Sequence, residues 1–86
     1  MNMQKFNVEI VYTNEFDPRT EMSIVETASF FTLSEAIDHS AEAAKSIEAA
    51  GRKAMISIWK FTLNEKLNVY SAPSSQPAIL TLDLSH

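Results

Sequence analysis

The sequence contains no cysteine, which excludes disulfide bonds, thiolate nucleophiles and thiolate metal sites. Its single glycine cannot build the glycine-rich loops with which P-loop and dinucleotide-binding proteins hold phosphates. No apolar run approaches the roughly 20 residues of a membrane-spanning helix. The first residues, Met-Asn-Met-Gln-Lys, do not open the apolar segment of a secretory signal. These absences favour a cytoplasmic protein with no membrane segment, and we expect no cofactor.

The composition is that of a small folded protein. Of the 86 residues, 45% are hydrophobic and 21% are charged, which is typical of a globular domain. A chain of this size buries roughly 60–65% of the surface that its unfolded form exposes. We therefore expect one domain over residues 1–86, with one core and little room for a deep enzyme cleft.

The first third of the chain predicts two strands. Residues 4–12 alternate between apolar and polar side chains, which indicates a half-buried strand. Its apolar face holds Phe6, Val8, Ile10 and Tyr12. Residues 13–20 are polar and include the turn signal Asp17-Pro18. Residues 21–31 predict a second strand, in which Glu26 interrupts the apolar alternation. Either a bulge or an edge position would place Glu26 in solvent.

A helix is predicted over residues 33–50. Thr32 and Glu35 match a capping box, and Gly51 stands where a left-handed residue ends a helix. The expected inner face is rich in alanine: Leu33, Ile37, Ala44 and Ile47, with Ala36, Ala43 and Ala50 beside them. The expected outer face carries Glu35, Asp38, Glu42 and Lys45. Glu48 and Arg52 are four residues apart, a spacing that favours an ion pair at the helix end.

The remaining sequence predicts more β-structure. Residues 53–62 are apolar on both faces, as in a central strand or one that contacts a partner. One face holds Ala54, Ile56 and Ile58, and the other holds Met55, Trp59 and Phe61. A turn and a return strand over 67–72 complete a hairpin. The spacer 73–77 then precedes a β segment over 78–84, which either closes its own sheet or pairs with a neighbouring subunit.

The order of elements is ββαββ plus a C-terminal β segment. It predicts an α+β fold, in which an antiparallel sheet of four to five strands carries one helix packed on one face. One helix covers only part of such a sheet, so the apolar residues left over need another cover. Trp59 either anchors the core against the helix or contacts a partner at an interface.

Neither catalysis nor metal binding is predicted. Asp38, His39 and Ser40 spell the letters of a catalytic triad, but consecutive helix residues point ~100° apart and cannot line up. His39 with Glu35 and Glu42 could share a helix side, which a glutamate-rich surface helix also gives by chance. Exposed carboxylates lack the burial that shifts a pKa for general acid–base work. We therefore expect that the protein is not an enzyme and holds no metal.

Charge is unevenly distributed along the chain. Residues 1–42 hold 2 basic and 8 acidic residues, a net charge of −6, and residues 43–86 hold 5 basic and 3 acidic residues, a net charge of +2. The acidic half suits a partner protein with a basic surface. Basic residues lie near aromatic ones around Trp59, as in some single-strand binders. The overall charge of −4 and the lack of a ribonucleoprotein motif disfavour nucleic acid as the ligand.

In size, acidity, lack of cysteine and ββαββ layout, the chain resembles small proteins encoded by phages and mobile elements, many of which are anti-CRISPR or other anti-defence inhibitors. The resemblance brings no motif and transfers no residues. It implies a non-enzymatic inhibitor in the host cytoplasm that blocks the nucleic-acid site of a defence protein through an acidic face. The residues expected to bind the partner are Glu26, Glu35, Asp38, Glu42, Trp59 and Phe61. The alternative is a homodimeric structural or assembly protein.

Overall fold

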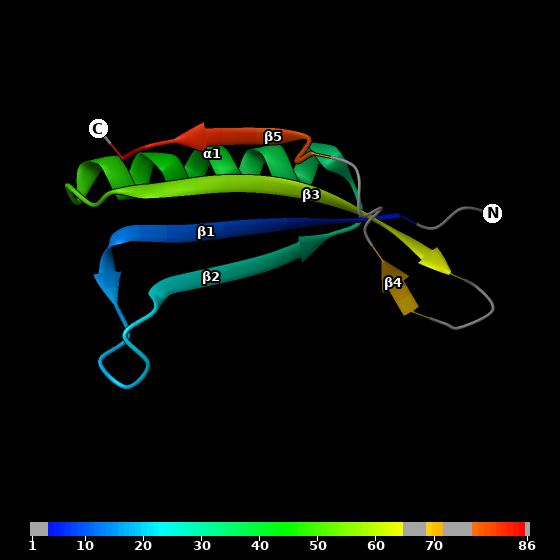
Figure 1. Ribbon diagram of the computed structural model, residues 1–86. Helices are drawn as coiled ribbons and strands as arrows, with labels where there is room; N and C mark the ends of the chain where they lie inside the picture. The colour runs from blue at the N-terminus through cyan, green and yellow to red at the C-terminus, as the bar shows by residue number, and fades with distance from the viewer. Residues whose placement is uncertain (1–3, 65–68, 72–76, 86) are drawn as a thin grey trace.

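A computed structural model of the chain describes residues 4–64, 69–71 and 77–85 (Figure 1). In chain order the elements are β1 (Gln4–Phe16), β2 (Ser23–Phe30), α1 (Leu33–Ala49), β3 (Ala54–Asn64), β4 (Val69–Ser71) and β5 (Leu80–Asp83). The predicted α+β fold, an antiparallel sheet with one helix on one face, is confirmed. The sequence predicts a turn over residues 63–66, but β3 continues through residues 63 and 64. Residues 65–68 and most of the spacer 73–77 lie outside the described residues.

All strand pairs are antiparallel, and the strands follow the order β2-β1-β3. The second edge of β3 is shared between two short strands. β5 pairs with residues 55–58 of β3, and β4 pairs with residues 62–64. The C-terminal β segment therefore closes the sheet of its own chain, which settles the choice that the sequence left open.

Both ends of α1 follow from their sequence. The hydroxyl oxygen of Thr32 accepts the Glu35 N–H at 3.2 Å, and the hydroxyl donates to the Glu35 carboxylate at 2.8 Å. Gly51 has φ of 68°, and Arg52 beyond it donates its N–H to the carbonyl of Ile47 at 2.9 Å. This is the Schellman geometry that glycine favours at a helix end. The predicted caps are confirmed, and the helix ends one residue earlier than predicted.

The core lies between α1 and one face of the sheet. Its buried members are Phe6, Val8, Ile10, Tyr12, Ala36, Ile47, Ala54, Ile56 and Ile58. The predicted inner face of the helix is wrong at Ile37, which is 44% exposed at the margin of the helix. Ser40 takes a central position instead, at 1% exposure. Its hydroxyl donates to the Ala36 carbonyl at 2.8 Å, so the buried oxygen is satisfied.

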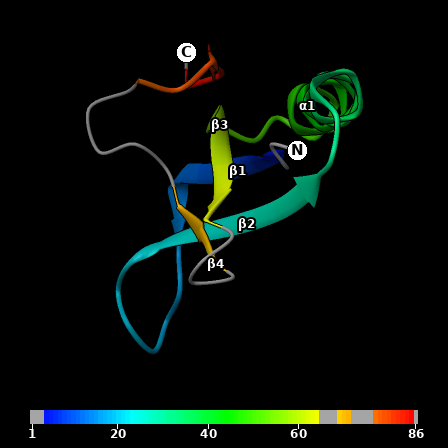
Figure 2. The same ribbon diagram turned by 90° about the vertical axis from the view of Figure 1, so that its right-hand side faces the viewer.

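The opposite face of the sheet is not covered by the helix (Figure 2). The register places alternate residues of the three long strands together there: Lys5, Asn7, Glu9 and Val11 of β1, Val25, Thr27 and Ser29 of β2, and Met55, Ser57, Trp59 and Phe61 of β3. We call this set the open face. Trp59 lies on it, pointing away from the side that α1 covers, so anchoring of Trp59 against the helix is wrong. The reason is strand alternation, which sends Trp59 and the buried Ile58 to opposite sides.

Strand β1 bends where the sequence predicts a loop. Val11 pairs with Val25 and Phe16 with Ser23, so residues 12–15 of β1 stand opposite Ile24 alone. Such an insertion of extra residues bends a strand and re-aims its side chains. The strand nevertheless continues to Phe16, beyond the predicted end at residue 12.

Candidate functional site

The six residues predicted to bind a partner lie on three separate surfaces. Glu35, Asp38 and Glu42 are exposed on α1, and Trp59 and Phe61 lie on the open face. Glu26 belongs to β2, opposite Ile10 on the side of the sheet that carries the helix. The eight acidic residues of the first 42 likewise do not form one acidic face, because Glu9 lies on the open face and Glu15 is paired with a cation.

The helix carries a stripe of negative charge, formed by Glu35, Asp38 and Glu42, which we call the acidic stripe. Their spacing of three and four residues puts all three on one side of α1, opposite the buried Ala36 and Ser40. Among the described residues, no cation forms an ion pair with the stripe. Like charges at this spacing destabilise a helix by about 0.2–0.5 kcal/mol per pair. Glu35 lies in the first turn, where a negative charge and the capping box favour the helix, and Lys45 stands three residues after Glu42. The repulsion within the stripe is therefore small, and the stripe is an exposed negative surface on α1.

The open face combines apolar and polar side chains. Trp59 and Phe61 are half-buried, whereas Met55 is 39% and Val25 49% exposed. Polar side chains lie beside these apolar ones on the same face. Among them, the Ser29 hydroxyl donates to the Asn7 side-chain oxygen at 2.7 Å. The face is thus neither a solvated polar surface nor a continuous apolar one.

A third cluster, which we call the clasp, sits at the bend of β1 and consists of Tyr12, Glu15, Glu26 and Arg52. Arg52 forms a two-pronged ion pair with Glu15, Nε to Oε2 at 2.7 Å and Nη2 to Oε1 at 2.8 Å. The guanidinium lies 3.8 Å from the centre of the Tyr12 ring. The Tyr12 hydroxyl donates to the Glu26 carboxylate at 3.1 Å. The cluster connects Arg52, in the segment between α1 and β3, to strands β1 and β2.

Within the clasp, the Arg52 charge pairs with Glu15, and the Glu26 carboxylate accepts its hydrogen bond from the neutral Tyr12 phenol. Burial, together with the hydrogen bond to Glu26, raises the pKa of the Tyr12 phenol. The hydrogen bond from Arg52 lowers the pKa of Glu15. Both pKa shifts follow from burial and hydrogen bonds within a structural network. Glu26, predicted to bind a partner, already has an intramolecular partner here.

Sequence reasoning missed the clasp. Helical spacing pointed to Glu48 as the partner of Arg52, but the left-handed Gly51 turns the chain out of the helix first. The carboxylate that Arg52 meets comes from Glu15, which is 37 residues distant in the sequence. A bulge in β1 brings it there, and no local pattern in the sequence signals that bulge.

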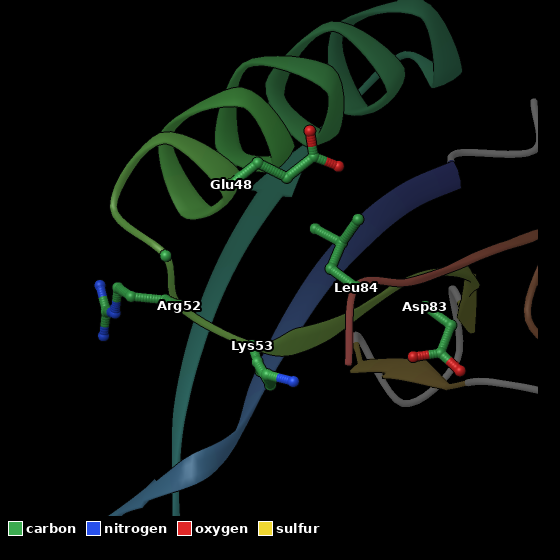
Figure 3. Close-up of a pocket in the computed structure, with 6 residues that line it drawn as sticks. Glu48, Arg52, Lys53, Asp83 and Leu84 are labelled. Atoms are coloured by element: carbon green, nitrogen blue, oxygen red, sulfur yellow. The ribbon is translucent and has the colours of Figure 1, made fainter. Parts of the chain in front are cut away.

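A shallow hollow of about 320 Å³ lies beside the helix end (Figure 3). Its lining residues are Glu48, Gly51, Arg52, Lys53, Asp83 and Leu84. Arg52 points away from Lys53 and Asp83, so the charged groups do not converge on one point. The described residues contain no group of three or more histidines and carboxylates placed to hold a metal ion.

Comparison with known proteins gives no match: no family model, no curated protein and no solved structure corresponds to the chain. Within the part of the chain that the structure describes, no helix has the length and apolar character needed to cross a membrane.

Proposed function

We propose that the protein is a non-enzymatic protein-binding module that presents the acidic stripe of α1 to a basic surface of a partner protein. The observation that carries the proposal is the stripe itself. Its carboxylates are exposed, and no described cation pairs with them. Asp38 and Glu42 have no intramolecular cation among the described residues, so their charges can pair with the cations of another protein.

The stripe is rigidly held. Glu35 also accepts a hydrogen bond from Thr32 at the helix N-cap, whereas Asp38 and Glu42 have no other described partner. The helix fixes their spacing, because its opposite side is packed into the core through Ala36 and Ile47. Residues 35–42 span roughly 10 Å of helix axis, so the three negative charges reach a partner with little loss of freedom on binding.

More specifically, we propose that the protein is an inhibitor of a nucleic-acid-binding defence protein. Lysine and arginine side chains that contact phosphates form a dense positive surface. A stripe of carboxylates docked there excludes the nucleic acid by occupying the same cations. Complementary charge accelerates the encounter, and added salt weakens it.

The test is an affinity capture with matched charge variants, using lysate of the cells in which the protein occurs. The variant Asp38→Lys/Glu42→Lys reverses the stripe and leaves the cap residue Glu35 intact. We expect at least about a tenfold loss of partner affinity, together with a weaker salt dependence. We also expect the captured partner to lose nucleic-acid binding when the wild-type protein is added, as measured by fluorescence anisotropy.

The matched control is Glu21→Lys/Glu48→Lys, which changes the net charge equally at two exposed positions outside the stripe. It should retain the partner. Equal affinity of the wild-type protein and the Asp38→Lys/Glu42→Lys variant at low salt would exclude the stripe as the binding surface. If the captured partner still binds nucleic acid unimpaired when the wild-type protein is added, the inhibitor role is excluded. The acidic stripe then remains the proposed binding surface.

A further inference from the structure

We propose that the partner protein docks by adding an extended basic segment to the outer edge of β2, as one more antiparallel strand of the sheet. The inference rests on the proposed function and specifies the form and the charge of the segment that the partner presents. β2 lies at the border of the sheet, and among the described strands it pairs with β1 alone (Figure 1). Its outer edge is therefore open to another strand.

The hydrogen-bond register shows which residues of β2 face outward. The Thr13 N–H donates to the Lys53 carbonyl at 3.0 Å, so the odd-numbered residues of β1 bond to β3. The even-numbered residues of β1 consequently bond to β2, where each is paired with an even-numbered residue. The backbone N–H and C=O groups of Val25, Thr27 and Ser29 therefore point away from the sheet. An antiparallel strand added at this edge bonds to all three residues.

β2 lacks the features that usually protect an edge strand. Such strands commonly carry lysine or proline, or contain a bulge, because unpaired backbone groups attract another chain. β2 has 8 residues and contains neither lysine nor proline. Its register with β1 is regular from Val25 to Phe30, and both Val25 and Thr27 are exposed. The edge is therefore accessible and long enough for a strand of ordinary length.

The charges beside the edge indicate that the added segment is basic. The His39 ring packs against the Phe30 ring, with 5.1 Å between their centres, so this side of α1 faces β2. Glu35 and Glu42 stand four residues before and three residues after His39 and share that side. Glu26 is exposed on the side of the sheet that carries the helix, and no described cation forms an ion pair with it. Lysine or arginine side chains on the added strand complement these carboxylates.

Strand alternation determines which residues of the segment are basic. Residues opposite Val25 or Thr27 bond to β2 and send their side chains to the open face, where β-branched residues suit the exposed Val25. Residues opposite Glu26 send their side chains toward α1 and turn their own N–H groups away from β2. The segment therefore alternates basic residues with β-branched ones. A second copy of β2 does not fit this requirement, because it brings Glu26 and no cation.

The first test uses a synthetic peptide that is as long as β2 and alternates lysine with threonine. It is titrated into the isotope-labelled protein and followed by NMR, and we expect the amide signals of Val25, Thr27 and Ser29 to shift most. N-methylation of every threonine removes the N–H groups that face β2 and should weaken binding at least about tenfold. N-methylation of every lysine is the matched control, because it alters N–H groups that face solvent, and it should weaken binding far less.

Three outcomes of the peptide test would overturn the proposal. One is the absence of binding by the unmodified peptide up to about 1 mM. Another is equal binding by the two methylated peptides, because a segment held by charge alone does not depend on which N–H groups are removed. The third is equal binding by a peptide that carries glutamate in place of lysine.

The second test uses the captured partner and two variants of β2. Thr27→Pro removes an outward N–H, and proline is tolerated at such an edge position. It should lower the partner affinity at least about tenfold, whereas Thr27→Val keeps the N–H and should not. Circular dichroism confirms that each variant is folded, and if Thr27→Pro does not fold, the methylated peptides still decide.

The variants also separate this proposal from the acidic stripe. If Asp38→Lys/Glu42→Lys weakens partner binding and folded Thr27→Pro does not, strand addition is excluded and the stripe remains the binding surface. If the charge reversal has no effect, the proposed function itself fails. A dimer of the pure protein that Thr27→Pro dissociates, seen by light scattering, would assign the edge to a second copy and overturn the proposal.

Discussion

At the scale of single residues, the turn between β1 and β2 combines a favourable and an unfavourable conformation. Asp17 accepts the Arg19 N–H on its carboxylate at 2.8 Å, which is the Asx turn that aspartate favours before proline. Four residues later, Glu21 has φ of 60°, a left-handed conformation that costs an L-residue about 1–2 kcal/mol. The Glu21 N–H donates to the Asp17 carbonyl at 2.8 Å, so the turn itself imposes this conformation.

Replacing Glu21 with glycine should therefore stabilise the protein. Glycine removes the strain in the folded protein. It also raises the conformational entropy of the unfolded chain, which offsets about 0.4–1 kcal/mol of the gain in stability. We expect the free energy of unfolding to rise by about 0.5 kcal/mol, measured by urea denaturation. Glu21→Ala is the control, since it removes the carboxylate and keeps the strained Cβ. Equal stabilisation by both variants would assign the effect to charge instead of backbone strain.

At the scale of elements, the clasp adds side-chain contacts between β1, β2 and the segment that leads from α1 into β3, at the point where the β1–β2 ladder is interrupted. The helix ends at Ala49, and Arg52 leads into β3. Its ion pair with Glu15 holds the bulged end of β1 beside this connection. Tyr12 is 3% exposed and anchors the same bulge from the core side. A bulge leaves part of a strand without regular ladder bonds, and the side chains of the clasp replace them.

The clasp should make stability depend on pH below the usual carboxylate range. Because Arg52 lowers the pKa of Glu15 in the folded protein, Glu15 contributes stability above its unfolded pKa. This contribution is lost as the pH falls through the lower folded pKa. We expect Glu15→Gln to be less stable than the wild-type protein at neutral pH and the difference to shrink in acid, measured by thermal unfolding. A constant difference across this range would contradict the role of the ion pair.

At the scale of the whole molecule, two layers must stabilise the fold. The Cα radius of gyration is 14.3 Å, larger than the roughly 12 Å of a compact domain of this length. One helix on one face of the sheet accounts for this extended form, because the other face has no covering layer among the described residues. The core is correspondingly small, and each of its members carries a large share of the stability.

Truncating a residue in the centre of this core should be severely destabilising. Ile58 is fully buried between the sheet and the helix. We expect Ile58→Ala to cost about 3 kcal/mol, out of a total of about 4–13 kcal/mol for a chain of this length. Ile37→Ala is the matched control, since Ile37 is 44% exposed, and its cost should stay below about 1 kcal/mol. Chemical denaturation measures both, and similar costs would contradict the assigned core.

Local sequence patterns determined the order of the elements and the caps of the helix, but not the end of β1. The alternation of β1, the capping pair Thr32 and Glu35, and the single glycine at the helix C-terminus each act within a few residues, so they can be recognised without the fold. The two-sided apolar pattern of residues 53–62 also predicted a central strand with one face left over. The acidic stripe was visible as well, because its spacing follows from helix geometry alone.

Only the tertiary structure decided which of these surfaces belong together. The sequence grouped Glu26 and Trp59 with the acidic stripe, but strand alternation and the position of the helix send them to different sides of the sheet. The clasp depends on a bulge and on a contact across 37 residues, which no local spacing encodes. Periodicity is a property of neighbours in the chain, whereas a surface is made by the register between strands that are far apart in it.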